Sequence, residues 1–139
     1  MNRLPRVETI SAVLLACLAA VNVLTAVSAQ VQWQASQDDP RFPLPTTAAP
    51  LSGNALPSYR DSTIAPDALT QAYLAILPQY GWAIDTKSSW GWNGKPKQPG
   101  DVYVIGICQN HSWSAVSIGP PSDGSDGSEF DLAIDADNC

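Results

Sequence analysis

The only histidine of the chain follows closely after a cysteine, which raises the question of a reactive pair. Cys108 precedes His111 by three residues, the spacing of a tight turn. A nucleophile and its base also need an orienting acid and a site for developing negative charge, and the sequence offers neither beside this pair. As metal ligands the two residues would supply only two of the four groups that zinc requires. We therefore predict no catalytic residue, no metal site and no cofactor, and we do not expect an enzyme.

Cys108 also has a second cysteine with which it could pair. It ends a predicted strand, and Cys139 follows another predicted strand by a few positions. If these strands lie side by side or nearly so, a bridge would pin the C-terminus and stabilise the fold by about 2–4 kcal/mol. We predict a Cys108–Cys139 disulfide, which implies an oxidising compartment.

Aromatic and basic side chains gather between residues 87 and 100. Trp90 and Trp92 flank one glycine, and Lys95 and Lys97 follow among further Gly and Pro residues. Indole rings in such a segment have few neighbours to bury them, and exposed indoles bind sugar rings, membrane interfaces and protein partners. We predict a binding role for these four residues. The alternative is that one Trp extends a strand into the core and the other covers a sheet edge.

The C-terminal stretch from residue 123 to residue 137 contains six carboxylates and no basic residue. Their spacing lacks the alternating ligands of a calcium-binding EF-hand loop. We predict a solvated acidic loop followed by the polar side of an edge strand, where charge discourages pairing with other chains.

The composition excludes a further class of function. Only 14% of the 139 residues are charged, and the formal net charge is −6. Binding to a phosphate backbone needs clustered Lys and Arg, so we expect no nucleic acid partner. A chain of this length holds at most one ordinary domain.

The first thirty residues include a segment that can cross a membrane. Residues 10–29 form a nearly unbroken apolar run of 20 residues, and a helix of that length spans about 30 Å, the thickness of a bilayer's hydrocarbon core. Arg3 and Arg6 precede the run, which predicts a cytoplasmic N-terminus and an extracytoplasmic remainder. We predict that residues 1–29 are a transmembrane anchor or a signal peptide. Cleavage after Ala29 would instead make the protein a secreted one.

Residues 30–65 are rich in proline and show no sustained period of 2 or 3.6. Five prolines stand at Pro40, Pro43, Pro45, Pro50 and Pro57. Proline at this density blocks helix propagation and central sheet pairing. We predict a Pro-rich spacer, extended near the membrane and packed on the following domain toward Tyr59.

Residues 66–139 are predicted to form a small α+β extracytoplasmic domain. Pro66 at the first helical position, apolar residues at helical spacing and Pro78 as a stop predict a helix over 66–77. The alternation of apolar residues then predicts four strands, near residues 82–87, 102–108, 113–118 and 130–134. Short connections favour an antiparallel meander with the strand at 102–108 in its centre. The helix would pack across this four-stranded sheet in two layers.

The order of these segments carries a resemblance. A hydrophobic N-terminal segment, a Pro-rich spacer and the sequence DALTQAYLAILPQYGW before a meander resemble small bacterial exported domains of uncharacterised function. The resemblance covers roughly residues 58–118 and rests on packing residues. It implies a fold and an extracytoplasmic location, and it implies no catalytic residue.

These observations lead to two expectations about function. The first is a non-enzymatic, membrane-anchored accessory or binding module that meets a protein partner at the outer face of the membrane. The alternative is a secreted protein that binds a carbohydrate or cell-wall ligand through Trp90 and Trp92. A small hydrolase is a weaker third interpretation, because nothing in the sequence distinguishes one carboxylate as the general acid and another as the general base.

Overall fold

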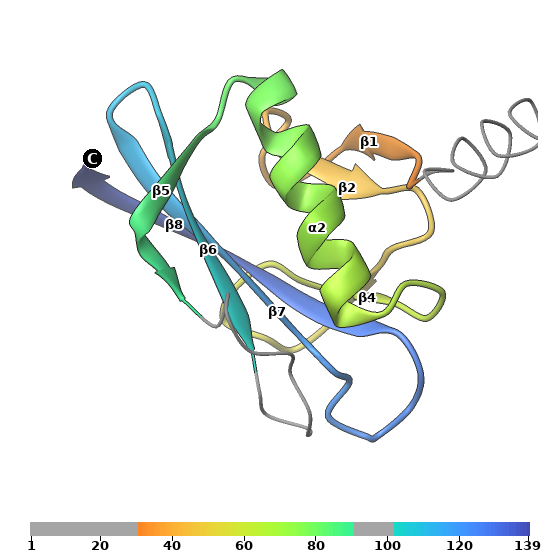
Figure 1. Cartoon of the computed structure of the whole chain (residues 1–139). Helices are drawn as coiled ribbons and strands as arrows, with labels where there is room; N and C mark the ends of the chain where they lie inside the picture. The colour runs from red at the N-terminus through yellow and green to blue at the C-terminus, as the bar shows by residue number, and fades with distance from the viewer. Residues whose placement is uncertain (1–30, 91–101) are drawn as a thin grey trace, which may run out of the picture. The chain divides into compact units, whose positions relative to one another are not determined.

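The computed structural model describes residues 31–90 and 102–139 of the chain (Figure 1). This part forms one α-helix, one short 3₁₀ helix and two antiparallel sheets. The elements are β1 (Trp33–Ala35), β2 (Pro43–Pro45), β3 (Ala49–Leu51), β4 (Ser58–Asp61), α2 (Pro66–Ile76), η1 (Leu77–Tyr80), β5 (Ala83–Trp90), β6 (Tyr103–Gln109), β7 (Ser112–Gly119) and β8 (Ser128–Asn138). The predicted α+β class is confirmed.

The sheets contain more strands than the four we predicted. β1 pairs with β2 alone, and the larger sheet has six strands in the order β3-β4-β8-β7-β6-β5. Strands β5 to β8 follow one another in the sheet as they do in the chain, as expected of a meander. β3 and β4 extend this meander beyond β8, because Tyr59 in β4 pairs with Phe130 in β8. Strand β8 is therefore an inner strand and not the edge strand that we expected, and β6 lies second from an edge and not in the centre.

Residues 30–65, which we expected to be a spacer, instead supply four of these strands. Proline is compatible with these strands because the prolines that lie within a strand are on edge strands, and the inner strand β4 contains none. In β2, only Leu44 between Pro43 and Pro45 has a backbone N–H, and in β3 Pro50 lies on the outermost strand of the large sheet. Proline is excluded only from central strands, so its density rules out neither the edge strands β1, β2 and β3 nor the short proline-free strand β4.

Helix α2 begins and ends close to the predicted positions. Pro66 and Asp67 occupy its first turn. The negative charge of Asp67 stabilises the helix, because it lies near the positive end of the helix dipole. Pro78 has no N–H for the next α-helical hydrogen bond, so the chain continues as the 3₁₀ helix η1. Gly81 ends this turn with a φ of 84°, a conformation that glycine adopts without strain.

The core lies between α2 and one face of the large sheet (Figure 1). Leu69, Tyr73 and Leu77 of the helical segment are fully buried. They pack with apolar side chains that alternate along the strands, namely Tyr59, Ile105, Ile107, Val116, Ile118, Phe130 and Leu132. Phe42 and Leu44 complete this cluster from the proline-rich segment, which is thus part of the domain.

Among the described residues, no helix is both long and apolar enough to cross a bilayer. The predicted anchor or signal segment, residues 1–29, lies outside the part of the chain that the structure describes.

Candidate functional site

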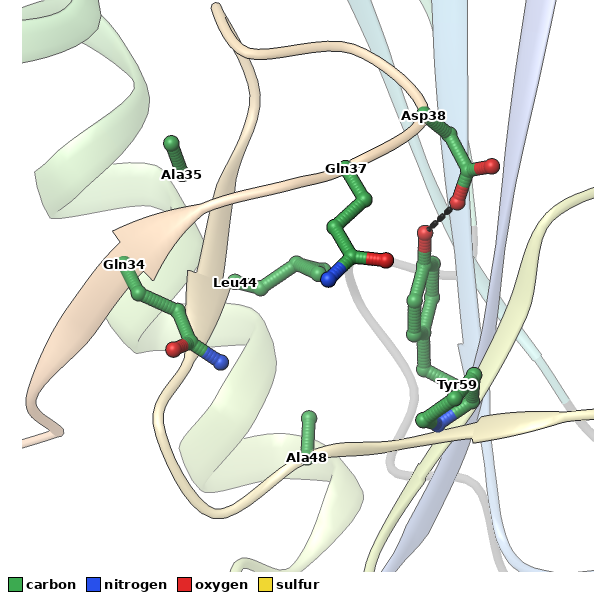
Figure 2. A pocket seen from close by; sticks show the side chains of 8 residues that line it. Gln34, Ala35, Gln37, Asp38, Leu44, Ala48 and Tyr59 are labelled. Atoms are coloured by element: carbon green, nitrogen blue, oxygen red, sulfur yellow. Dashed lines mark hydrogen bonds between the residues drawn. The ribbon is translucent and has the colours of Figure 1, made fainter.

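A hollow of about 160 Å³ opens beside the two-stranded sheet, where β1 and its following loop face β4 (Figure 2). It is lined by Gln34, Ala35, Gln37, Asp38, Leu44, Ala48, Pro50 and Tyr59. Gln34, Gln37 and Asp38 are exposed, whereas Leu44 and Tyr59 are buried. The hollow therefore combines exposed polar side chains with an apolar floor.

The loop between β1 and β2 is folded around a buried hydroxyl group. Ser36 is only 2% exposed, and its Oγ accepts the backbone N–H groups of Asp38 at 3.2 Å and of Asp39 at 3.5 Å. The backbone N–H of Ser36 donates to the carbonyl of Phe42 at 2.9 Å and closes the loop. Asp38 thus projects from a backbone that is held at several points.

The side chain of Asp38 is fixed by a tyrosine of the large sheet. The Tyr59 hydroxyl donates to Asp38 Oδ2 (Figure 2) and lies 3.2 Å from Ser36 Oγ. The ring of Tyr59 stacks on Phe130 with centroids 5.5 Å apart, so the hydroxyl is anchored to the core. Burial, together with the nearby Asp38 carboxylate, raises the pKa of Tyr59. The phenol therefore stays protonated at neutral pH and acts as a donor, not as a base for Ser36.

The neighbouring carboxylate has a different role. Both oxygens of Asp39 accept from the Arg41 guanidinium, at 2.9 Å from Nε and 2.7 Å from an Nη atom. These hydrogen bonds lower the pKa of Asp39 and hold it ionised. Arg41 also lies 5.5 Å from the Trp82 ring centroid, and the Trp82 indole N–H donates to the Arg41 carbonyl at 3.0 Å. This pair fastens the loop to the core and is a structural tie.

Two further groups of carboxylates also serve the fold. Asp61 is fully buried, and burial favours a higher pKa, but hydrogen bonds from Thr47 and Thr63 outweigh this effect and lower its pKa. Arg60 of β4 forms ion pairs with Asp123 of the acidic loop and with Glu129 at the start of β8. Part of the loop that we expected to be solvated is therefore bound to the sheet.

The structure places the predicted disulfide residues together. The sulfur atoms of Cys108 and Cys139 are at disulfide distance, with their Cα atoms 6.0 Å apart, a separation that a disulfide spans without backbone movement. His111 lies in the tight turn after β6, is exposed, and has a φ of 65°.

The predicted aromatic and basic site falls mainly outside the described residues. Trp90 is the last residue of β5, where its backbone pairs with Val104 of β6. Trp92, Lys95 and Lys97 lie outside the part of the chain that the structure describes. Within residues 31–90 and 102–139, no group of three or more His, Cys, Asp or Glu side chains is arranged to hold a metal ion.

The hollow is not among the sites predicted from the sequence. Its polar residues lie in the segment that we expected to be a spacer, and its buried hydroxyl comes from Tyr59, which is 21 residues from Asp38. One local signal was present, because Ser36 followed by two Asp residues and Pro40 is typical of a hydrogen-bonded turn.

Comparison of the chain with protein-family models, with curated proteins and with solved structures gives no match.

Proposed function

We propose that this chain is an exported, membrane-tethered binding module, and that the hollow beside Asp38 is its binding site. The observation that carries the proposal is the contrast among its carboxylates. Asp39, Asp61 and Glu129 are buried or partly buried, and each accepts hydrogen bonds that tie the fold together. Asp38 also accepts a hydrogen bond, from Tyr59, but it is exposed at the hollow and has no ion-pair partner among the described residues. A pre-positioned polar group at such an opening favours binding of a ligand.

The size and chemistry of the hollow favour binding over catalysis. Its volume of about 160 Å³ is below the several hundred Å³ of sites that enclose a whole small molecule. It suits one side chain or one small polar group of a larger partner. Ser36, the nearest hydroxyl nucleophile, is buried, and its neighbour Tyr59 remains protonated.

The proposed location rests on the sequence and on the cysteines. Residues 10–29 are apolar and follow Arg3 and Arg6, a pattern that favours export with a cytoplasmic N-terminus. Cys108 and Cys139 at disulfide distance suit an oxidising compartment. We propose that the anchor is retained and that the partner is a protein at the outer membrane face.

Site-specific photo-crosslinking in intact cells tests the binding role. A photoreactive residue in place of Gln37 should give a crosslinked product that disappears with an added Asp38→Asn substitution. The same residue in place of Asp126, an exposed position in the acidic loop, is the matched control. Equal yields of crosslinked product from both positions would contradict the proposed site. So would a yield at position 37 that Asp38→Asn leaves unchanged.

Intact mass and N-terminal sequencing of the native protein test the tether. A retained Met1 or an intact residue 1–29 segment supports anchoring, whereas a mature start at Gln30 rules it out. A start at Gln30, together with tryptophan fluorescence that responds to a glycan, would favour the secreted alternative with Trp90 and Trp92 as ligand contacts.

A further inference from the structure

The carboxylate of Asp38 indicates which chemical class of ligand the hollow would take, an inference that rests on the binding role proposed above. We infer that the hollow binds a primary alkylammonium group, the chemistry shared by a lysine side chain and a free alkylamine. Asp38 is the only carboxylate lining the hollow, and within the described residues no cationic side chain forms an ion pair with it.

The two adjacent aspartates show why an ammonium fits better than a guanidinium. Asp39 uses both carboxylate oxygens to accept two N–H groups from Arg41. In Asp38, the Oδ2 atom already accepts the Tyr59 hydroxyl, so a planar two-pronged donor would have to share that oxygen with Tyr59. An ammonium is a compact charge that needs only one carboxylate oxygen.

The rest of the lining supplies what an alkylammonium group needs. Its three N–H donors require further acceptors, which the exposed side-chain amides of Gln34 and Gln37 can provide from β1 and its following loop (Figure 2). Neither amide forms a hydrogen bond with another described side chain. The methylene stem would lie on Leu44, in a space whose volume of about 160 Å³ matches a single side chain.

The charge of the whole segment favours the same ligand class. Beyond residue 30 the chain has 12 acidic and 5 basic residues, which gives a formal charge of −7. A negative surface attracts cations and raises their local concentration. A neutral or anionic ligand would gain nothing from this field.

Titrations followed by NMR of the full chain in a neutral detergent test the inference. n-Butylammonium should shift the side-chain amide resonances of Gln34 and Gln37, whereas 1-butanol, its neutral isostere, and N-butylguanidinium should bind at least several-fold more weakly. Asp38→Asn should weaken n-butylammonium binding about tenfold or more, the loss expected for one hydrogen bond to a charged group. Asp126→Asn removes an equal charge from the exposed acidic loop and should leave the affinity within about twofold.

A blocked lysine dipeptide separates the two sources of the ammonium group. Tighter binding of the dipeptide than of n-butylammonium indicates a lysine of a partner protein, and equal binding indicates a free alkylamine; both support the inference. Equal binding of 1-butanol, or an affinity unchanged by Asp38→Asn, overturns it. In that case crosslinking at position 37 still decides whether the hollow is a binding site for another class of ligand.

Discussion

The backbone carbonyl oxygen of Asp61 lies 2.1 Å from the position that a Cβ atom would take at Gly127. Gly127 also has a φ of 101°, a conformation that other residues rarely adopt. This close approach brings the turn after β4 against the loop that leads into β8, where Ser128 Oγ donates to the Ile64 carbonyl at 2.5 Å. The absence of a side chain at Gly127 is therefore a condition for joining β4 to β8.

Gly127→Ala should destabilise the domain strongly. The added Cβ would collide with the Asp61 carbonyl, and alanine rarely adopts the positive φ of this position. We therefore expect the free energy of unfolding to fall by about 3 kcal/mol or more. Gly124→Ala is the matched control in the same loop, because its φ is 74° but no atom lies within 4 Å of the added Cβ. It should cost only about 1 kcal/mol. Equal losses in urea unfolding of the two variants would show that the Asp61 contact is unimportant.

Two tyrosine-to-phenylalanine substitutions should have opposite effects. Tyr73 is fully buried, and its hydroxyl has no hydrogen-bond partner among the described residues. Tyr73→Phe should therefore raise the free energy of unfolding by up to about 1 kcal/mol, because an unpaired buried hydroxyl is removed. Tyr59→Phe removes a hydroxyl that is bonded to Asp38 and Ser36 and should lower it by about 1–2 kcal/mol. Thermal and urea unfolding measure both changes, and a loss of stability in Tyr73→Phe would contradict the first.

The stability of the domain should decrease as the pH falls from about 4 to 2. The folded structure lowers the pKa of Asp39 and Asp61, and lowers that of Asp123 to about 2. A carboxyl group with a lowered pKa contributes its full stabilisation above its unfolded value, near 4, and loses it as the pH falls through the folded value. Urea unfolding at several pH values measures this loss.

Asp61→Asn identifies the contribution of one of these groups. It should lower the free energy of unfolding at pH 7 by about 2 kcal/mol, because Thr47 and Thr63 lose a charged acceptor. It should also make stability less dependent on pH between about 4 and 2. A pH dependence equal to that of the wild type would show that Asp61 does not contribute to it.

Peptide mapping without reductant should find Cys108 linked to Cys139 in protein from its native compartment. Reduction, or Cys139→Ser, should lower the free energy of unfolding by about 2–4 kcal/mol, because the cross-link restricts the unfolded chain over a separation of 31 residues. Cys17→Ser is a control that leaves this pair intact. Two free thiols in the native material would refute the prediction.

Local signals explain which parts of the fold could be predicted from the sequence. The start and end of α2 follow from Pro66 and Pro78, and strands β5 to β8 follow from short-range alternation. The pairing of β4 with β8 joins Tyr59 to Phe130 across most of the domain, and no short-range pattern reveals such a pairing. The hollow also depends on a contact that no short-range pattern reveals, since the orientation of Asp38 depends on the hydroxyl of Tyr59, 21 residues away.

The strand order also has a consequence for how the domain forms as the chain emerges. β8 is last in chain order among the described strands, yet it lies between β4 and β7. Residues 49–61, which include β3 and β4, therefore cannot join the rest of the large sheet until residues 128–138 have been synthesised. Until then Tyr59 lacks Phe130, on which its ring stacks. The large sheet is therefore completed only when the last described strand is added, a long-range pairing of the kind that forms slowly.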